Sequence, residues 1–325
     1  MRVLYIVPLG PAGTASMVFA HSEIERIAAV GIETAVFPFP TSARPDLLFR
    51  QIRAIRSRIR QFKPDVVHAH YGTITAFATV AAADVPVVIT FRGSDLNPSP
   101  TDGPVRNAVQ KFLSNTSARF AKAVILVSRD LRARLWAEHP NAHVIPTGVD
   151  LNLFKPASRA SAREKLGWSH DDPVVLFNAG TTPRVKRLDL AEQSLELLRQ
   201  RVPNVSMEVL RGMTPHDALP LYMNASDCLL LTSDFEGSPD IVKEALACNL
   251  PIVSVDAGDV KERTRGVKGA VIVTRDPVAI ASELARMLLL NERSNGRDKI
   301  EELDSSKIRD AVIKVYQQIL DGRRG

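Results

Sequence analysis

Eleven short apolar runs, separated by longer segments with helical periodicity, are the feature that most constrains the fold of this chain. The runs are rich in β-branched residues and stay apolar along their length, which is typical of strands buried on both faces of a parallel sheet. They form two series, which predicts two doubly wound α/β domains one after the other. The runs are RVLYIVPL, ETAVFPF, DVVHAH, VPVVITF, AVILVS and HVIPTG, then PVVLFNAG, VSMEVLRG, DCLLLTS, LPIVSVDAG and GAVIVT.

The strand-and-helix pattern breaks at LFKPASR, which predicts the boundary between the two domains. We expect an N-terminal domain over residues 1–157, a C-terminal domain over 158–305 and a last helix over 306–325. The apolar stripe of that helix needs a surface to pack on, and a return to the first domain would supply one. Ligands of such folds bind at the carboxyl ends of the strands, so the cleft between the domains is the expected site.

The composition is that of an ordinary globular protein, with 325 residues, 45% of them hydrophobic. The two cysteines, Cys228 and Cys248, lie in apolar surroundings and are expected to be free thiols in a reducing compartment. The basic and then apolar start is interpreted as a first strand rather than a signal peptide. No run is long and apolar enough to span a membrane, so we expect a cytoplasmic protein.

The positive charge is concentrated in the first half of the chain. Residues 1–157 hold 18 Lys and Arg against 11 Asp and Glu, which suggests that this half faces something anionic. The segment from Arg50 to Lys63 is basic apart from an apolar stripe at helical spacing. It can be a core-packing helix with a solvated basic face, or a helix that rests on anionic lipid at the inner face of the membrane.

A strand, a short loop and a helix carry two glutamates in the stretch SDFEGSPDIVKEALAC. Ser238 suits a helix N-cap and Pro239 a first helical residue, so a helix N-terminus would lie directly after the strand. Such an end attracts phosphate, and carboxylates beside it can accept hydrogen bonds from sugar hydroxyls. Glu236 and Glu244 then suit a nucleotide sugar, whereas the alternative is ordinary charge around a helix end.

Other strand ends carry polar side chains as well. The loop after VVLFNAG holds three cations that suit a pyrophosphate. His68 and His70 end an earlier strand and can be a metal pair or a packed pair, but no third metal ligand is evident. The first loop has glycines for close backbone approach, yet neither a dinucleotide fingerprint nor a Walker A pattern occurs. Arg92 and Asp95 follow another strand of the first half.

Taken in order, these motifs resemble glycosyltransferase family 4, retaining enzymes of the GT-B fold, with two Rossmann-like domains. The resemblance is carried by the glycine loop, DVVHAH, TFRGSD, VS at Val127–Ser128, IPTGVD, the basic loop, SDFEGSPDIVKEALA and PIVSVDAG. It implies transfer of a sugar from a nucleotide-diphosphate sugar to a hydroxyl of a glycan or lipid-linked acceptor, in cell-surface polysaccharide or glycolipid synthesis. It implies no cofactor, no metal and no nucleic acid.

The resemblance also assigns roles to residues. Lys186 falls on a phosphate-binding lysine, Glu244 on a ribose-binding glutamate and Glu236 on a glutamate near the transferred sugar. The catalytic set is Glu236, Lys186 and Arg92, and the acceptor-side candidates are His70, Arg92 and Asp95. The donor-binding set is Gly13, Thr14, Thr181, Arg184, Lys186, Arg187, Glu236, Gly237, Ser238, Asp240, Ile241 and Glu244. Retention would use the leaving phosphate to help deprotonate the acceptor hydroxyl.

Two positions depart from the pattern of the family. Thr181 stands where an arginine usually precedes the phosphate lysine, so Arg184 or Arg187 is expected to replace it. Arg92 stands where the family has a histidine, and because arginine cannot act as a base, we expect it to meet an anionic group.

Three other classes of protein remain as alternatives. A nucleotide-sugar epimerase of the same fold would need acid and base side chains around the sugar. A catalytically silent partner protein would lack donor binding. A periplasmic binding protein would need an export signal.

Overall fold

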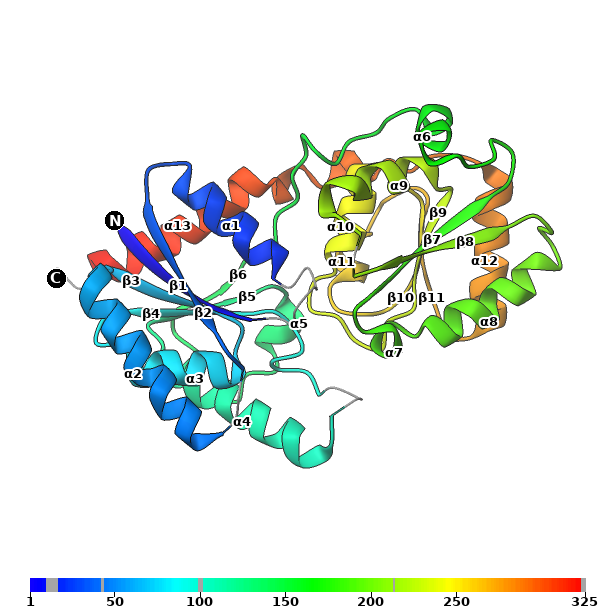
Figure 1. Ribbon diagram of the computed structural model, residues 1–325. Coiled ribbons are helices and arrows are strands. Elements are labelled where there is room, and N and C mark those ends of the chain that lie inside the picture. Colours follow the sequence, from blue (N-terminus) through cyan, green and yellow to red (C-terminus); the bar gives the residue numbers. More distant parts are fainter. Residues whose placement is uncertain (10–16, 42–43, 99–101, 213, 323–325) are drawn as a thin grey trace. The chain divides into compact units, whose positions relative to one another are not determined.

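The computed structural model describes residues 1–9, 17–41, 44–98, 102–212 and 214–322. These residues form two compact units, one of Met1–Gly148 with Ser305–Gly325 and the other of Val149–Asp304. In each unit, helices cover both faces of a parallel sheet (Figure 1). The expected fold class, two doubly wound α/β domains, is therefore confirmed.

The described part of the first unit has one sheet with the strand order β2-β1-β3-β4-β5-β6. All of its strand pairs are parallel. The order reverses between β1 and β3, because the chain moves outward from β1 to β2 and then returns to the other side of β1. The strands are β1 (Arg2–Pro8), β2 (Glu33–Phe39), β3 (Val66–His70), β4 (Val87–Phe91), β5 (Ala123–Leu126) and β6 (Ala142–Val144).

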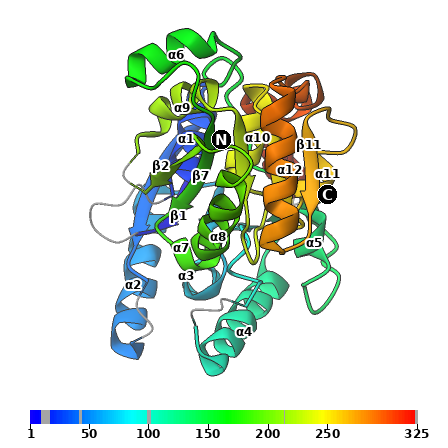
Figure 2. The ribbon, with the colours of Figure 1, turned by 90° about the vertical axis from the view of Figure 1, so that its right-hand side faces the viewer.

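Helices from both ends of the chain cover one face of this sheet. Buried side chains of the first and last helices pack with those of β1 on that face. The opposite face is covered by α2, α3 and α4, as right-handed crossovers require (Figures 1 and 2). The helices are α1 (Val18–Ala28), α2 (Pro45–Phe62), α3 (Thr73–Ala82), α4 (Pro104–Phe120), α5 (Arg129–Arg132) and α13 (Ser305–Asp321).

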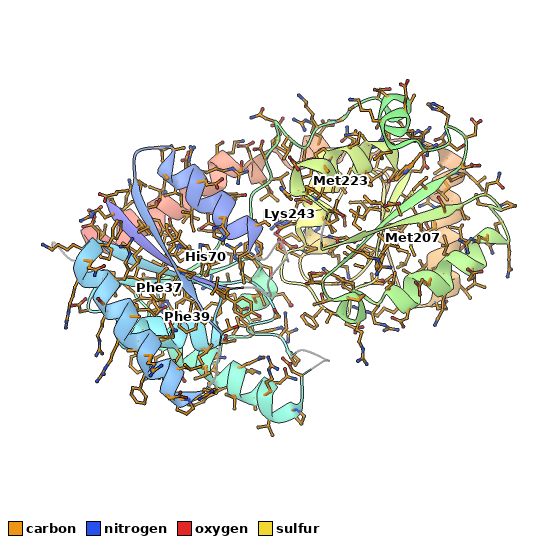
Figure 3. The ribbon with its side chains drawn as sticks, in the orientation of Figure 1. Phe37, Phe39, His70, Met207, Met223 and Lys243 are labelled. Carbon is orange, nitrogen blue, oxygen red and sulfur yellow. The ribbon has the colours of Figure 1, made fainter. Side chains whose placement is uncertain are left out.

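The apolar stripe predicted for the basic segment packs as expected. Ile55, Ile59 and Phe62 of α2 are buried, and they pack in one cluster with Phe37 and Phe39 of β2 (Figure 3). The arginines on the rest of the helix are exposed or half-buried. In the described part of the chain, no helix combines the length and the apolar character needed to cross a membrane.

The second unit is built in the same way around strands in the order β11-β10-β9-β7-β8. Helices α8 and α12 pack on one face of the sheet, and α9 and α10 lie on the other (Figure 1). The strands are β7 (Val174–Gly180), β8 (Ser206–Arg211), β9 (Cys228–Leu231), β10 (Ile252–Val255) and β11 (Ala270–Val273). The helices are α6 (Arg159–Leu166), α7 (Pro183–Lys186), α8 (Leu188–Arg199), α9 (Leu219–Ala225), α10 (Asp240–Ala247), α11 (Val260–Arg263) and α12 (Pro277–Leu290), with 3₁₀ turns η1 (His216–Ala218), η2 (Gly296–Lys299) and η3 (Glu301–Leu303).

The first change of unit lies at Gly148, earlier in the chain than the expected boundary at residue 157. The segment that follows belongs to the second unit because the guanidinium of Arg297 donates to the carbonyl oxygens of Leu151 and Phe154. At the other end, α13 returns to the first unit. Its Tyr316 is fully buried and its hydroxyl lies 3.2 Å from that of Tyr5 on β1.

Candidate functional site

The second sheet has its switch point between β9 and β7, whose loops carry most of the residues predicted to bind a donor. The two strands pair directly and run parallel, so the loops that follow them leave the same edge of the sheet. The neighbouring loop after β10 leaves that edge too. Open α/β sheets bind their ligands at such a point.

Lys186 and Glu236 meet at this edge. The Lys186 ammonium donates to Glu236 Oε1 over 2.6 Å, and the Ser233 hydroxyl donates to the same oxygen over 2.6 Å. Both charged side chains are mostly buried, with exposed fractions of 19% and 13%. The structure therefore brings two of the predicted catalytic residues into one ion pair.

Hydrogen bonds from side chains to backbone carbonyl oxygens fix the loops that carry this pair. The Thr232 hydroxyl donates to the carbonyl oxygens of Lys186 and Arg187. From the end of β11, the guanidinium of Arg275 donates to the carbonyl oxygens of Ser233, at 2.8 Å, and Asp234, at 3.1 Å. The sequence analysis missed Arg275, although its place two residues after an apolar run was the same signal that picked out the other loops.

Helix α10 begins one residue later than predicted. Pro239 is the N-cap residue, the helix starts at Asp240, and no side chain caps it. Ser238 is not the cap because its hydroxyl donates instead to Asp259 Oδ2, over 2.9 Å. The first backbone N–H groups, those of Asp240 and Ile241, lack the side-chain acceptor that usually satisfies a helix start, which suits an anionic ligand.

Glu244 lies inside α10, where it is buried and pairs with a histidine. His216 Nε2 lies 2.7 Å from Glu244 Oε1, and the His216 ring packs against that of Phe154. Burial raises the pKa of the Glu244 carboxyl above its ordinary range, and the bond to His216 opposes that rise. Sequence reasoning missed His216, since nothing in its local motif separates it from a surface histidine.

Gly237 and Gly258 pack their loops closely together. Gly258 has a φ of +60°, and a Cβ added to it would lie 2.8 Å from the carbonyl oxygen of Gly237 and 3.1 Å from Glu236 Cβ. A side chain at this position would therefore push the loop that carries Glu236. Position 258 therefore requires glycine for two reasons, its positive φ and the lack of space for a side chain.

The remaining residues of the basic loop differ in how far their charge is compensated. Arg187 pairs with Asp189 at 2.9 Å and Asp234 at 3.3 Å, so it is engaged with carboxylates. Arg184 is exposed and forms no ion pair with another described residue. Thr181 packs on Gly212, where an added Cβ would lie 2.5 Å from its methyl carbon. Arg184 is thus the cation that this loop leaves available.

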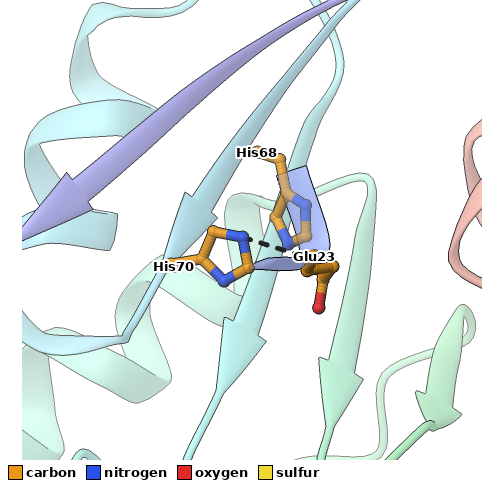
Figure 4. A group of neighbouring side chains, drawn as sticks. All are labelled: Glu23, His68 and His70. Atoms are coloured by element: carbon orange, nitrogen blue, oxygen red, sulfur yellow. Dashed lines mark ion pairs between the residues drawn. The ribbon is translucent and has the colours of Figure 1, made fainter. Parts of the chain in front are cut away.

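The first unit gathers Glu23, His70 and Arg92 at the carboxyl end of β3 (Figure 4 shows Glu23 and His70). Arg92 Nη2 lies 2.9 Å from His70 Nδ1 and 3.4 Å from Glu23 Oε2, and Nη1 donates to Thr147. Because guanidinium only donates, His70 Nδ1 accepts and Nε2 carries the ring proton. Burial lowers the pKa of His70 well below its ordinary value and raises that of Glu23.

His68 is held in the same core by the C-terminal helix. Its Nδ1 lies 2.6 Å from the Tyr316 hydroxyl, and its Nε2 lies 2.7 Å from the Thr90 hydroxyl. The ring stacks on that of His70 with 4.5 Å between centroids. Burial is the main cause that lowers the pKa of His68, to about 3, so the ring is neutral at physiological pH.

Glu23 supplies the third group that the sequence analysis did not find beside the two histidines. One potential ligand atom from each of Glu23, His68 and His70 lies within 4.8 Å of the others. However, both His68 nitrogens already have partners, and the Arg92 guanidinium occupies His70 Nδ1. A cation held by all three residues would have to displace Tyr316 or Thr90 from His68. His70 Nε2, which lies 3.5 Å from Glu23 Oε1, would also have to lose its proton, so the arrangement fits a neutral histidine pair beside an ion pair better than a metal site.

Asp95 organises the backbone around this cluster. Its buried carboxylate accepts hydrogen bonds from the backbone N–H groups of Gly72, Arg92 and Gly93. It would have to give up those bonds to reach an acceptor. The loop it binds is strained, with φ values of 80° at Tyr71 and 55° at Thr73. The remaining predicted donor contacts, Gly13 and Thr14, lie outside the described residues.

Two doubly wound parallel-sheet domains in one chain are the architecture of the GT-B class, and comparison with known proteins agrees with that class. Residues 9–153 match the profile of Glycosyltransferase Family 4, and residues 169–289 match that of Glycosyl transferases group 1. Together the two matches span most of the chain and support a glycosyltransferase of the GT-B fold.

Similar curated proteins are named glycosyltransferases. A putative teichuronic acid biosynthesis glycosyltransferase of Bacillus subtilis is 25% identical over 70% of this chain and 62% of its own length. A D-inositol 3-phosphate glycosyltransferase of Catenulispora acidiphila is 26% identical over 80% of this chain and 74% of its own. The match thus spans less than two thirds of the first of these relatives.

Solved structures share the fold at low sequence identity. Sucrose-phosphate synthase from Thermosynechococcus elongatus aligns with a TM-score of 0.81 and 17% identity, over 99% of this chain and 100% of that one. The UDP-GlcNAc 2-epimerase from Methanocaldococcus jannaschii aligns with a TM-score of 0.62 and 12% identity, over 98% and 100% of the two chains. Transferases and epimerases share this fold, so the fold alone does not separate them.

Proposed function

We propose that the protein is a retaining, metal-independent glycosyltransferase. It moves a sugar from a nucleotide-diphosphate sugar to a hydroxyl of a glycan or lipid-linked acceptor in cell-surface polysaccharide or glycolipid synthesis. The observation that carries the proposal is the Lys186–Glu236 ion pair beside the uncapped start of α10. That arrangement offers a cation, backbone donors and a carboxylate within one set of adjoining loops.

Each part suits one portion of a donor. The N–H groups of Asp240 and Ile241 and the ammonium of Lys186 suit the diphosphate. Glu244, held by His216, suits the paired hydroxyls of a ribose. Glu236 lies between these elements and suits the transferred sugar. Arg184 replaces the arginine that is missing at Thr181 because the carboxylates Asp189 and Asp234 engage Arg187.

The reaction follows from this assignment. The bond between the anomeric carbon and the diphosphate oxygen breaks, and a bond to the acceptor oxygen forms on the same face of the sugar. The acceptor proton passes to the departing phosphate oxygen. Lys186 and the α10 N-terminus stabilise the charge that develops there, which is the main contribution the protein makes. When Lys186 turns to the diphosphate, Glu236 is released to accept a hydrogen bond from a sugar hydroxyl.

The first unit takes the acceptor in this proposal. Its excess of basic residues suits an anionic acceptor, and the names of both relatives refer to acidic or phosphorylated compounds. Arg92 and His70 are the residues placed to meet it, with Asp95 holding their loop. The exposed arginines of α2 suit contact with an anionic membrane at its cytoplasmic face. Co-sedimentation with anionic vesicles at low salt tests that contact, and failure to bind would remove it.

A panel of UDP-, GDP- and ADP-sugars tests the proposed activity. We expect slow hydrolysis of one donor with release of the nucleotide, because without an acceptor a transferase can transfer the sugar to water. Interconversion of the sugar without release would show an epimerase instead. Absence of binding to every donor would show a silent partner protein. Once an acceptor is found, NMR of the product shows whether the anomeric configuration of the donor is retained. Activity measured in EDTA shows whether the reaction needs a metal.

A further inference from the structure

Helix α4 buries its polar face and exposes an apolar one, which is the reverse of the usual arrangement on a globular protein. The side chains it buries against the unit are Ser114, Asn115, Ser117 and Ala118. Its exposed side chains include Val105, Val109, Phe112 and Phe120, each between 51% and 76% exposed. At 3.6 residues per turn, these four lie within roughly 80° of one another, so they form one apolar stripe. We call them the α4 stripe.

Hydrogen bonds hold the polar face in place. The Ser114 hydroxyl donates to the Asp95 carbonyl oxygen and accepts from the backbone N–H of Thr73. The Asn115 side-chain oxygen accepts from the backbone N–H of Trp136. The helix is therefore anchored without burying its apolar residues. An amphipathic helix normally turns those residues inward, so an outward stripe points to an external partner.

Aromatic side chains gather around the stripe. The Trp136 ring is 58% exposed and lies 6.1 Å from that of Phe112. Within the described ranges, every phenylalanine or tryptophan that is more than half exposed lies on α2, on α4 or just after α5. These are Phe49, Phe112, Phe120 and Trp136. Tryptophan favours the boundary between lipid head groups and acyl chains, and phenylalanine is typical of the apolar face of interfacial helices.

The charges next to the stripe indicate the nature of the partner. Helix α4 carries Arg106, Lys111 and Arg119 and contains no acidic residue. Helix α2 carries five arginines and one aspartate, Asp46. The two helices lie on either side of α3 on the same face of the sheet (Figures 1 and 2). Basic residues beside exposed aromatic and aliphatic ones complement an anionic lipid surface.

We propose that the α4 stripe and Trp136 insert into the interfacial region of an anionic membrane. The arginines of α2 and α4 supply long-range attraction, and the stripe supplies the apolar contact that holds the protein there. The inference rests on the membrane contact proposed above for α2 and adds an apolar anchor to it. It does not depend on the transfer reaction, because binding to a vesicle needs neither donor nor acceptor. It also differs from attraction through α2 alone, since insertion of apolar side chains resists salt whereas charge attraction is screened.

Vesicle binding tests the proposal. The full chain is prepared with Trp168→Phe, which leaves Trp136 as the one tryptophan of the sequence. We expect its emission to shift to the blue on vesicles of phosphatidylcholine with phosphatidylglycerol, and about half or more of the binding to survive 0.5 M NaCl. The double variant Val109→Asn/Phe112→Asn should need about tenfold more lipid for half-maximal binding. Leu289→Asn, at a residue of the second unit that is 77% exposed, is the matched control and should bind like the parent.

Three results would overturn the proposal. The Trp136 emission could stay unchanged on vesicles, or the double variant could bind lipid as well as the parent does. Alternatively, the parent could elute as a dimer in size-exclusion chromatography and the double variant as a monomer with unaltered vesicle binding. That last result would assign the stripe to a second copy of the chain. Nucleotide release by each variant, measured in the same samples, reports separately on the proposed activity.

Discussion

The ammonium group of Lys186 and the carboxylate of Glu236 form an ion pair 2.6 Å long in the second unit. Lys186 ends α7 after β7, and Glu236 follows β9, so the pair joins the loops on both sides of the switch point. In the proposed reaction, the diphosphate takes over Lys186 and frees Glu236. The same two residues thus hold the two loops together, and in the proposed reaction they contact different parts of the donor.

Substitutions at this pair should separate binding from turnover. Lys186→Ala removes a charge next to the diphosphate, so we expect nucleotide affinity and turnover both to fall, turnover by roughly 100-fold. Glu236→Gln keeps the shape but loses the charge, so turnover should fall by roughly 100-fold while the nucleotide binds within about threefold of the parent. Isothermal titration with the nucleotide and donor-hydrolysis rates measure the two effects. Equal loss of nucleotide affinity in both variants would contradict this division.

Glu244 should make stability depend on pH. Burial raises its folded-state pKa above the ordinary 4.5, so the protonated form is favoured by folding. Its contribution to stability is therefore fully present below pH 4.5 and lost as pH rises through the raised pKa. Glu244→Gln should match the parent at low pH and become relatively more stable towards neutral pH. Urea unfolding from pH 4 to 8 measures this.

Two further measurements make the Glu244 prediction specific. Glu192→Gln, at an exposed glutamate of α8, is the matched control substitution and is measured over the same pH range. Glu244→Gln should also weaken nucleotide binding, by about tenfold, because a charged hydrogen-bond acceptor for the ribose is lost. A variant that is more stable at neutral pH and still binds nucleotide normally would show that Glu244 does not contact the ligand.

Gly258 and Gly266 provide a matched pair for the loop beneath Glu236. Both have positive φ, +60° and +72°, but a Cβ on Gly266 meets nothing within 4 Å, whereas one on Gly258 meets the Gly237 carbonyl oxygen at 2.8 Å. Each change to alanine should cost about 1 kcal/mol of unfolding free energy from backbone strain. Gly258→Ala alone should also lower donor hydrolysis, because it moves Glu236. Similar activities in the two variants would argue against this steric coupling.

Arg92 and Glu23 should be coupled in a double-mutant cycle. Their side chains are 8% and 13% exposed, so Arg92→Ala leaves a nearly buried carboxylate without its cation. We expect a loss of about 3 kcal/mol of unfolding free energy, part of which Glu23→Gln restores in the double variant. Arg106→Ala, which removes a 71% exposed arginine from its pair with Asp102, should cost less than about 1 kcal/mol. Additive losses at Arg92 and Glu23 would contradict the coupling.

Transfer rates of Arg92→Ala with acidic and with neutral sugar donors test whether this arginine also binds an anionic group of the substrate. If it reads a sugar carboxylate, transfer of acidic sugars should fall more than transfer of neutral ones. Equal loss for both kinds of donor would assign Arg92 to the structure of the first unit. The contact with Glu23 favours that second outcome for the free protein, since the charge of Arg92 already has a partner.

Local patterns predicted most of the secondary structure. The run ETAVFPF coincides with β2, Glu33–Phe39, and PVVLFNAG contains β7, Val174–Gly180. The stripe of the basic segment packs where its helical spacing predicted. These features follow from side-chain periodicity, which neighbouring residues determine. The start of α10 did not follow, because Ser238 binds Asp259, a residue 21 positions away, instead of capping its own helix.

The sequence by itself determined the two-sheet architecture and the loops that hold the candidate site, because apolar runs and strand-end polar residues are local signals. Only the tertiary structure decided the partners: His216 for Glu244, Glu23 for Arg92, and Tyr316 of the last helix for His68. Those partners lie on different elements, and the packing of whole layers brings them together. Local periodicity carries no information about such long-range pairs, which is why the outward stripe of α4 also became visible only in the folded protein.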